Sequence, residues 1–181
     1  MKPLTRPARR AILVVHATAS AGWLGLTLGL LALALTAYTT ESAVMIEAAC
    51  RSMKVFTDWL VLPVALLTLA SGLVLSLGTK WGLARYRWVC TKFWLTLATT
   101  TATALALRPG VTRAVDTVAA GGVLADPLDL VMGPAVSLST YVFMTVISVL
   151  KPWGLTRRGR RLRAPATSPK ALDERSLSRT A

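Results

Sequence analysis

The sequence predicts an all-α membrane protein: a bundle of four transmembrane helices with both termini in the cytoplasm and a disordered basic C-terminal tail. The first observation is composition, because 54% of the 181 residues are hydrophobic and only 16% are charged, against about 25% charged in ordinary soluble chains. The second is that apolar residues form runs long enough to cross a bilayer, which takes about 20 helical residues. The third is that basic residues collect between and after these runs, so nucleic acid is not an expected partner.

The first predicted span covers residues 11–37, which include no formally charged side chain. A basic lead-in, 1–10, precedes it and contains Pro3 and Pro7. A cleaved signal peptide is the alternative, but its apolar region would cover only about 7 to 15 residues, so we favour a retained helix. Small side chains recur at every fourth position of this span and predict close packing against another helix. They are Ala17, Ala21, Gly25 and Gly29.

The second predicted span covers residues 59–77, where Pro63 favours a kink. Before it, residues 41–58 predict an amphipathic helix, which Ser42 can cap at its N-terminus. The sequence leaves open whether this helix is separate or an extension of the second span. Oppositely charged side chains four positions apart support an exposed helix here. These pairs are Glu47 with Arg51 and Lys54 with Asp58.

The third predicted span covers residues 88–107. The triplet Arg108-Pro109-Gly110 follows it and predicts the end of the helix, because proline and glycine interrupt helices. Residues 111–129 then predict a longer connection with a short interfacial helix. The helical spacing of the polar residues in the third span predicts a stripe along the span, with Lys92 nearest the cytoplasmic side. They are Lys92, Thr96, Thr99 and Thr103.

The fourth predicted span covers residues 128–150, with Asp126 and Pro127 favouring a helix start and Lys151 before a proline favouring its end. Beyond it, residues 151–181 contain too few apolar residues to form a core, so a disordered polybasic tail is expected. Its arginines are expected to lie on anionic lipid headgroups. They are Arg157, Arg158, Arg160, Arg161 and Arg163.

The positions of the charges and cysteines predict the orientation of the chain. Seventeen of the 21 lysines and arginines fall in the lead-in, between the second and third spans, and in the tail. Basic residues concentrate on the cytoplasmic side of membrane proteins, so both termini are expected there. Cys50 and Cys90 then lie on opposite sides of the bilayer and are too far apart for a disulfide. Cys50 either pairs with another chain or remains an idle thiol.

Two ionisable side chains fall inside the predicted spans. His16, the single histidine, lies about 12 Å from the membrane centre by helical rise, and Lys92 enters its own span to a comparable depth. Such groups in a membrane raise a functional hypothesis, and together with Ser20 and Thr96 they could line one polar pocket. The alternative is structural: Lys92 extends to the headgroups and His16 bonds to Ser20 or to a backbone carbonyl. No catalytic residue or metal site is expected, because zinc needs three or four ligands.

The motif HATASAGWLG in the first span and WVCTKFW at the start of the third resemble a bacterial family of small integral membrane proteins, found in high-GC Gram-positive bacteria. Across residues 10–150 the pattern also looks distantly like the four-helix cores of HemJ-type protoporphyrinogen oxidases and copper-resistance D proteins. The HemJ-type resemblance implies haem binding by a first-helix histidine and a later His-x-Lys motif. His16 and Lys92 fall at the corresponding places, whereas Cys90 stands where the second histidine would be.

The sequence therefore favours a multi-pass protein of a bacterial plasma membrane that serves as a structural or accessory subunit. Its expected partners are anionic lipids and either a second copy of the chain or a membrane complex. Enzyme activity is not favoured. Two alternatives remain: a redox protein that binds haem b through His16 and Lys92, and permeation of a small solute or metal.

Overall fold

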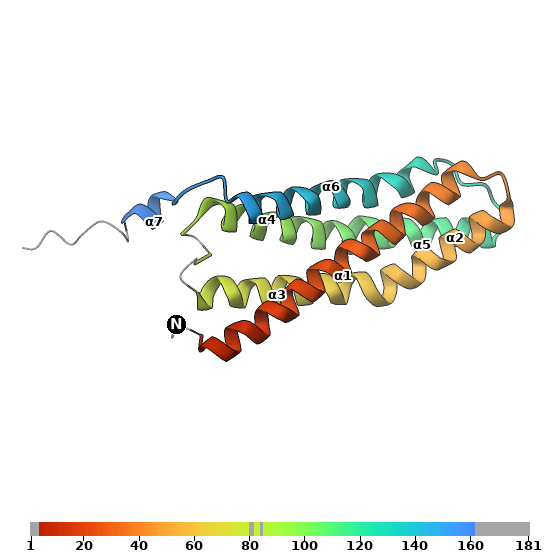
Figure 1. Ribbon diagram of the computed structural model, residues 1–181. Coiled ribbons are helices and arrows are strands. Elements are labelled where there is room, and N and C mark those ends of the chain that lie inside the picture. The colour runs from red at the N-terminus through yellow and green to blue at the C-terminus, as the bar shows by residue number, and fades with distance from the viewer. Residues whose placement is uncertain (1–3, 80–81, 84, 162–181) are drawn as a thin grey trace, which may run out of the picture.

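Helices make up nearly all of the chain that the structure describes. This computed structural model describes residues 4–79, 82–83 and 85–161. The long helices run side by side in alternating directions, and α1 crosses α3 obliquely (Figure 1). In chain order the elements are the α-helices α1 (Arg6–Thr39) and α2 (Ala43–Val55), the π-helix η1 (Phe56–Val61), α3 (Leu62–Gly78), α4 (Arg87–Ala102), the π-helix η2 (Thr103–Leu107), α5 (Arg108–Ala119), α6 (Leu128–Leu150) and α7 (Arg157–Arg161).

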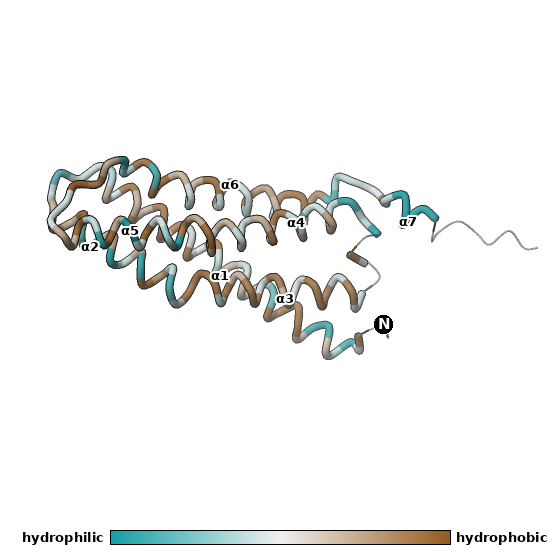
Figure 2. The backbone as a smooth tube through the Cα atoms, turned by 180° about the vertical axis from the view of Figure 1, so that it is seen from behind, coloured by the Kyte–Doolittle hydropathy of each residue, from teal (hydrophilic) through white to brown (hydrophobic). Residues whose placement is uncertain are grey.

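Three helices of the described chain are long and apolar enough to cross a membrane. They are Arg6–Thr39, Ala43–Gly78 and Leu128–Leu150. Hydrophobic residues colour much of their length, whereas α7 and the first turn of α1 are hydrophilic (Figure 2). The predicted spans 11–37, 59–77 and 128–150 lie within these helices. The predicted third span, 88–107, is helical throughout but is not among the three.

The first helix begins earlier than predicted. Helix α1 starts at Arg6, inside the segment 1–10 that was expected to be a lead-in. Pro7 explains the early start, because a proline in the first turn has a suitable φ and the N–H that it lacks needs no partner there. At the next connection Ser42 caps α2 as predicted, and its hydroxyl accepts a hydrogen bond from the backbone N–H of Met45 at 3.4 Å.

Helix α2 continues without a break through η1 into α3, so the predicted amphipathic helix 41–58 is an extension of the second span. Both predicted i,i+4 ion pairs form along it: Arg51 lies 2.7 Å from Glu47, and Lys54 lies 2.9 Å from Asp58. The amphipathic segment therefore extends the bundle as one rigid helix rather than covering it as a separate element.

The two π-helices each precede a proline. Proline lacks a backbone N–H, and its ring clashes with the carbonyl four residues earlier. For Pro63 and Pro109 those carbonyls belong to Trp59 and Leu105, which lie in η1 and η2. A π turn is wider by one residue, so it accommodates the proline and the helix continues. The predicted helix end at residues 108–110 is therefore wrong. Helix α5 runs on into the first part of the predicted connection, where a short helix was expected.

The buried face of α1 differs from the predicted packing stripe. Ala17, Ala21 and Gly25 are exposed, and only the half-buried Gly29 approaches a neighbour, the ring of Phe56. The stripe therefore does not pack against the other helices of this chain. Larger side chains make more van der Waals contacts than glycine or alanine, which favours the face that carries a tryptophan and a leucine. That buried face consists of Ala19, Trp23, Thr27, Leu30, Ala34 and Ala37.

The C-terminal segment folds back on the bundle. Thr156 donates its backbone N–H to the carbonyl of Arg85 at 3.0 Å, and Gly159 is buried against the same carbonyl. The predicted disorder is therefore wrong for α7, because these backbone contacts hold it against the connection between α3 and α4. Four of the predicted lipid-binding arginines lie in α7 and are exposed, whereas Arg163 lies outside the described residues. The exposed four are Arg157, Arg158, Arg160 and Arg161.

Both cysteines are free thiols. Cys50 is buried in the core, with 1% of its surface exposed, and it therefore cannot meet a thiol of another chain. The structure thus supports the idle-thiol alternative for Cys50. Cys90 is half-buried on α4.

Candidate functional site

A cavity of about 590 Å³ lies between α1, α3, α4 and α6. It occupies the end of the bundle at which α1 begins and α6 ends (Figure 1). This volume is within the range of pockets that hold small organic molecules, roughly 300 to 1,000 Å³. We refer to this cavity as the pocket.

Helical spacing explains which side chains line the pocket. Helix α1 contributes Arg9, Leu13 and His16, which follow one another at intervals of four and three residues and so share one face. Helices α3 and α4 contribute most of the apolar wall. Its side chains are Leu69, Leu73, Leu75, Leu83, Trp88, Val89 and Phe93.

His16 is held by the backbone and a hydroxyl of α3. Its Nδ1 lies 3.2 Å from the carbonyl of Thr68 and 3.0 Å from the hydroxyl of Ser71. That hydroxyl donates its own hydrogen to the carbonyl of Leu67 at 2.7 Å, so it accepts from the histidine, and a carbonyl can only accept. The hydrogen of the neutral ring is therefore on Nδ1, and Nε2 carries the lone pair. Of the two predicted kinds of structural partner, the backbone carbonyl is the one that forms.

A glycine allows this approach of the imidazole to α3. A Cβ at Gly72 would lie 3.0 Å from Cε1 of His16, which is closer than such atoms normally come. The ring therefore packs against the backbone of α3, and any larger residue would displace it. Thr68 and Ser71, on the same helix, are both buried.

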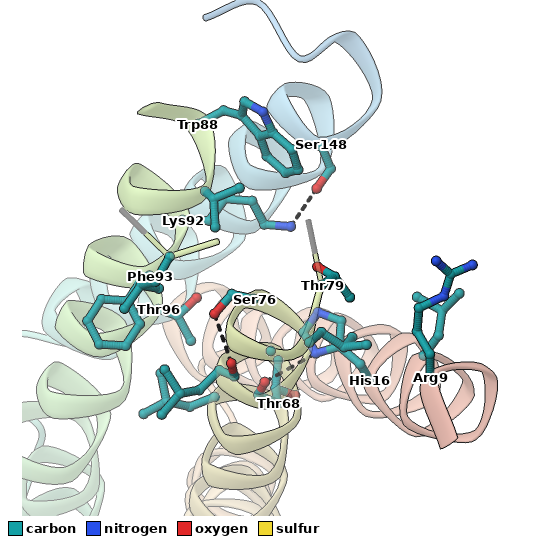
Figure 3. A pocket seen from close by; sticks show the side chains of 17 residues that line it. Arg9, His16, Thr68, Ser76, Thr79, Trp88, Lys92, Phe93, Thr96 and Ser148 are labelled. Atoms are coloured by element: carbon teal, nitrogen blue, oxygen red, sulfur yellow. Dashed lines mark hydrogen bonds between the residues drawn. The ribbon is translucent and has the colours of Figure 1, made fainter. Parts of the chain in front are cut away.

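Lys92 enters the pocket from α4, and its ammonium donates a hydrogen bond to the hydroxyl of Ser148 on α6 (Figure 3). The predicted meeting of His16, Lys92 and Thr96 in one pocket is confirmed, whereas Ser20 is not part of the lining. The hydroxyl that binds the ammonium of Lys92 lies two residues before the end of α6.

The pocket is basic and lacks acidic side chains. Among the described residues its lining includes Arg9, His16 and Lys92 but no aspartate or glutamate. A second cavity, of about 370 Å³ between α5 and α6, differs because its lining contains Arg113 together with two aspartates. The positive charges of the pocket therefore have no negative counterpart within the part of the chain that the structure describes.

Arg9 is a lining residue that the sequence analysis missed. It was assigned to a lead-in, although its spacing of seven residues from His16, two helical turns, would have placed both on one face. Thr68 also belongs to the lining. It is buried with 7% of its surface exposed, and its hydroxyl oxygen has no hydrogen-bond partner among the described residues.

The arrangement offers one ligand atom for a metal-containing cofactor. Metal-binding histidines commonly donate their second ring N–H to a carbonyl, as His16 does from Nδ1 to Thr68. Haem can be held by one axial histidine, so Nε2 of His16 fits that role, and Lys92 fits a propionate. Within the described residues no group of three histidine, cysteine, aspartate or glutamate side chains is placed to hold a bare metal ion.

Comparison of the chain with protein-family models, with curated proteins and with solved structures gives no match.

Proposed function

We propose that this protein binds an amphipathic small molecule with an acidic group inside the membrane. The observation that carries the proposal is the charge of the pocket, where Lys92 and Arg9 occur without a carboxylate. An ammonium group is costly in a low-dielectric environment unless an anion or several hydrogen bonds stabilise it, and the hydroxyl of Ser148 is neutral. An acidic headgroup would supply the missing charge while its apolar body contacts the leucine-rich wall.

The membrane arrangement that we infer has four crossings, with α4 and η2 forming the third, and both termini in the cytoplasm of a bacterial cell. The distribution of lysine and arginine supports this orientation. In it the pocket lies in the cytoplasmic half of the bilayer, with Arg9 near the headgroups, so an amphipathic molecule of the inner leaflet would need no passage through water. Binding such a molecule is compatible with an accessory role in a membrane complex, which stays a prediction.

A titration with a fluorescent fatty acid tests the proposal on the detergent-purified full-length chain. Lys92→Gln should weaken binding by about tenfold, the usual effect of losing one hydrogen bond to a charged group. Lys92→Arg should retain binding, because it keeps the charge. Lys54→Gln is the matched control, since Lys54 lies at the other end of the bundle and pairs with Asp58. Equal affinity in the wild type and Lys92→Gln would contradict the proposal.

Haem is a second candidate, which the ring orientation of His16 favours. Nε2 of His16 would bind the iron, and Lys92 would pair with a propionate. The resemblance to HemJ-type oxidases implies haem binding by the corresponding residues. Bound haem would supply one-electron redox chemistry. An absorption band in the Soret region that disappears in His16→Ala would support this candidate, whereas a preparation that stays colourless after haem addition would exclude it. Permeation of a solute or metal stays a prediction.

A further inference from the structure

We infer that the pocket selects amphipathic molecules whose headgroup carries two negative charges, and that Arg9 is the residue that recognises the second charge. This inference rests on the proposed function and names the class of ligand for the same pocket. It concerns a residue at the mouth of the pocket rather than the buried lysine.

The two cations approach the pocket from different helices. Arg9 lies on α1 and Lys92 on α4, and Figure 3 shows them on different sides of the pocket, with His16 and Thr79 between them in this view. Arg9 and His16 are separated by two helical turns, which corresponds to about 10 Å along α1. Arg9 is exposed and Lys92 is half-buried, so one cation lies at the mouth and the other deeper inside.

The number of cations in the pocket favours a headgroup with two negative charges over one with a single charge. Arginine is always protonated in proteins, and neither Arg9 nor Lys92 forms an ion pair among the described residues. A single carboxylate could neutralise only one of them. A phosphate monoester carries about 1.5 to 2 negative charges at neutral pH, and a dicarboxylate carries two, so either would neutralise both cations. The guanidinium can also bind an oxyanion through two parallel hydrogen bonds.

The wall of the pocket supports the same choice of headgroup. Its lining contains Arg9, His16 and Lys92 and, among the described residues, no aspartate or glutamate. These basic side chains favour an oxygen-rich anion over a single carboxylate.

Native mass spectrometry of the full-length protein in a neutral detergent tests the inference. The three probes have alkyl chains of nearly equal length and differ in the headgroup: dodecyl phosphate, dodecylsuccinate and dodecanoate. The wild type should bind the two dianions about tenfold more tightly than dodecanoate, as expected for one additional charged hydrogen bond. Arg9→Gln should remove this preference, so that the variant binds the dianions no more tightly than dodecanoate. Arg10→Gln is the matched control, because Arg10 is equally exposed but does not line the pocket.

Each outcome has one meaning. Tight binding of both dianions that depends on Arg9 supports the inference, and a preference for only one of them identifies the headgroup as a phosphate or a dicarboxylate. Equal binding of all three probes overturns the inference but leaves the proposed function intact. An equal loss of all three probes in Arg9→Gln also overturns it, because Arg9 would then not recognise the second charge. If none of the probes binds, both proposals fail.

Discussion

The two ends of the bundle differ in packing. At the end formed by α2 and α5, Met53 and Val111 have no exposed surface, and a continuous core surrounds them. At the end that contains the pocket, α1 has no fully buried residue before Ala19, and α4 has none before Thr99. The core therefore reaches α2 and α5 at one end, whereas at the other end the larger of the two cavities separates α1 from α4.

The two ends also differ in the partners of their charged side chains. Asp58 in η1 lies 2.9 Å from Lys54 and 2.8 Å from Arg108, so an ion-pair network joins the two wide turns of neighbouring helices. Lys92 has a hydroxyl as its hydrogen-bond partner instead of a carboxylate. The cluster around Asp58 is therefore neutralised within the protein, whereas the pocket is not. The proposed anionic ligand would account for this difference.

The largest expected effect is the loss of packing at the closed end. Met53→Ala should lower the free energy of unfolding by about 3 kcal/mol, because it leaves a cavity in a fully buried site. Leu73→Ala, in the wall of the pocket, should cost about 1 kcal/mol, since its side chain already borders a space. Thermal unfolding in detergent measures both. Similar losses in the two variants would show that the ends do not differ in packing.

The next effect concerns the ion-pair network. Asp58→Asn should lower the free energy of unfolding by about 2 kcal/mol, because two cations then lose their anion at a partly buried position. Glu47→Gln is the control, since the pair of Glu47 with Arg51 is largely exposed and should contribute less than about 1 kcal/mol. The same thermal unfolding experiment compares them, and an Asp58 variant as stable as the Glu47 variant would show that the network contributes little.

A change of opposite sign is expected at the pocket. Lys92→Met should raise the stability of the ligand-free protein by about 1 kcal/mol, because it removes a cation that has no anionic partner. The same variant should lose binding of the fluorescent fatty acid. A decrease in unfolding temperature with lipid removed would indicate that Lys92 has a structural role.

The smallest expected effect on stability comes from replacing single glycines by alanine. Gly72→Ala should change the unfolding temperature by only a few degrees but displace His16, which the chemical shifts of the imidazole in an NMR spectrum would report. Gly25→Ala is the control, because a Cβ there meets no atom within 4 Å. It should be neutral or slightly stabilising, and His16 should keep its wild-type shifts. An unshifted His16 in Gly72→Ala would mean that the close packing of the ring is not required.

Local signals in the sequence predicted much of the fold. Helix α6 begins and ends where predicted, because Pro127 and the Lys151-Pro152 pair act on their own neighbours. The prediction failed at Pro109, where a wide turn that depends on packing against η1 keeps the helix intact. It also failed for the buried face of α1, because the rotation of a helix is set by the helices around it rather than by its own small residues.

The candidate site was predicted in part for the same reason. His16 and Lys92 were recognisable because ionisable groups are rare in apolar spans. The hydrogen bonds that fix the ring are made with Thr68 and Ser71, which lie more than 50 positions after His16 in the chain. A pattern of neighbouring residues cannot predict contacts over such a separation. Arg9 was missed because a basic residue before a span usually marks orientation, and its place in the pocket depends on where α1 begins.

The number of residues in the wide turn η1 sets the direction in which the side chains of α3 point. A π turn contains one residue more than an α turn, and each residue of an α-helix turns the following side chains by about 100°. Removing one residue between Phe56 and Val61 would therefore rotate the inner face of α3 away from α1. The imidazole would then meet leucine side chains instead of a carbonyl, although every residue of α3 were still present.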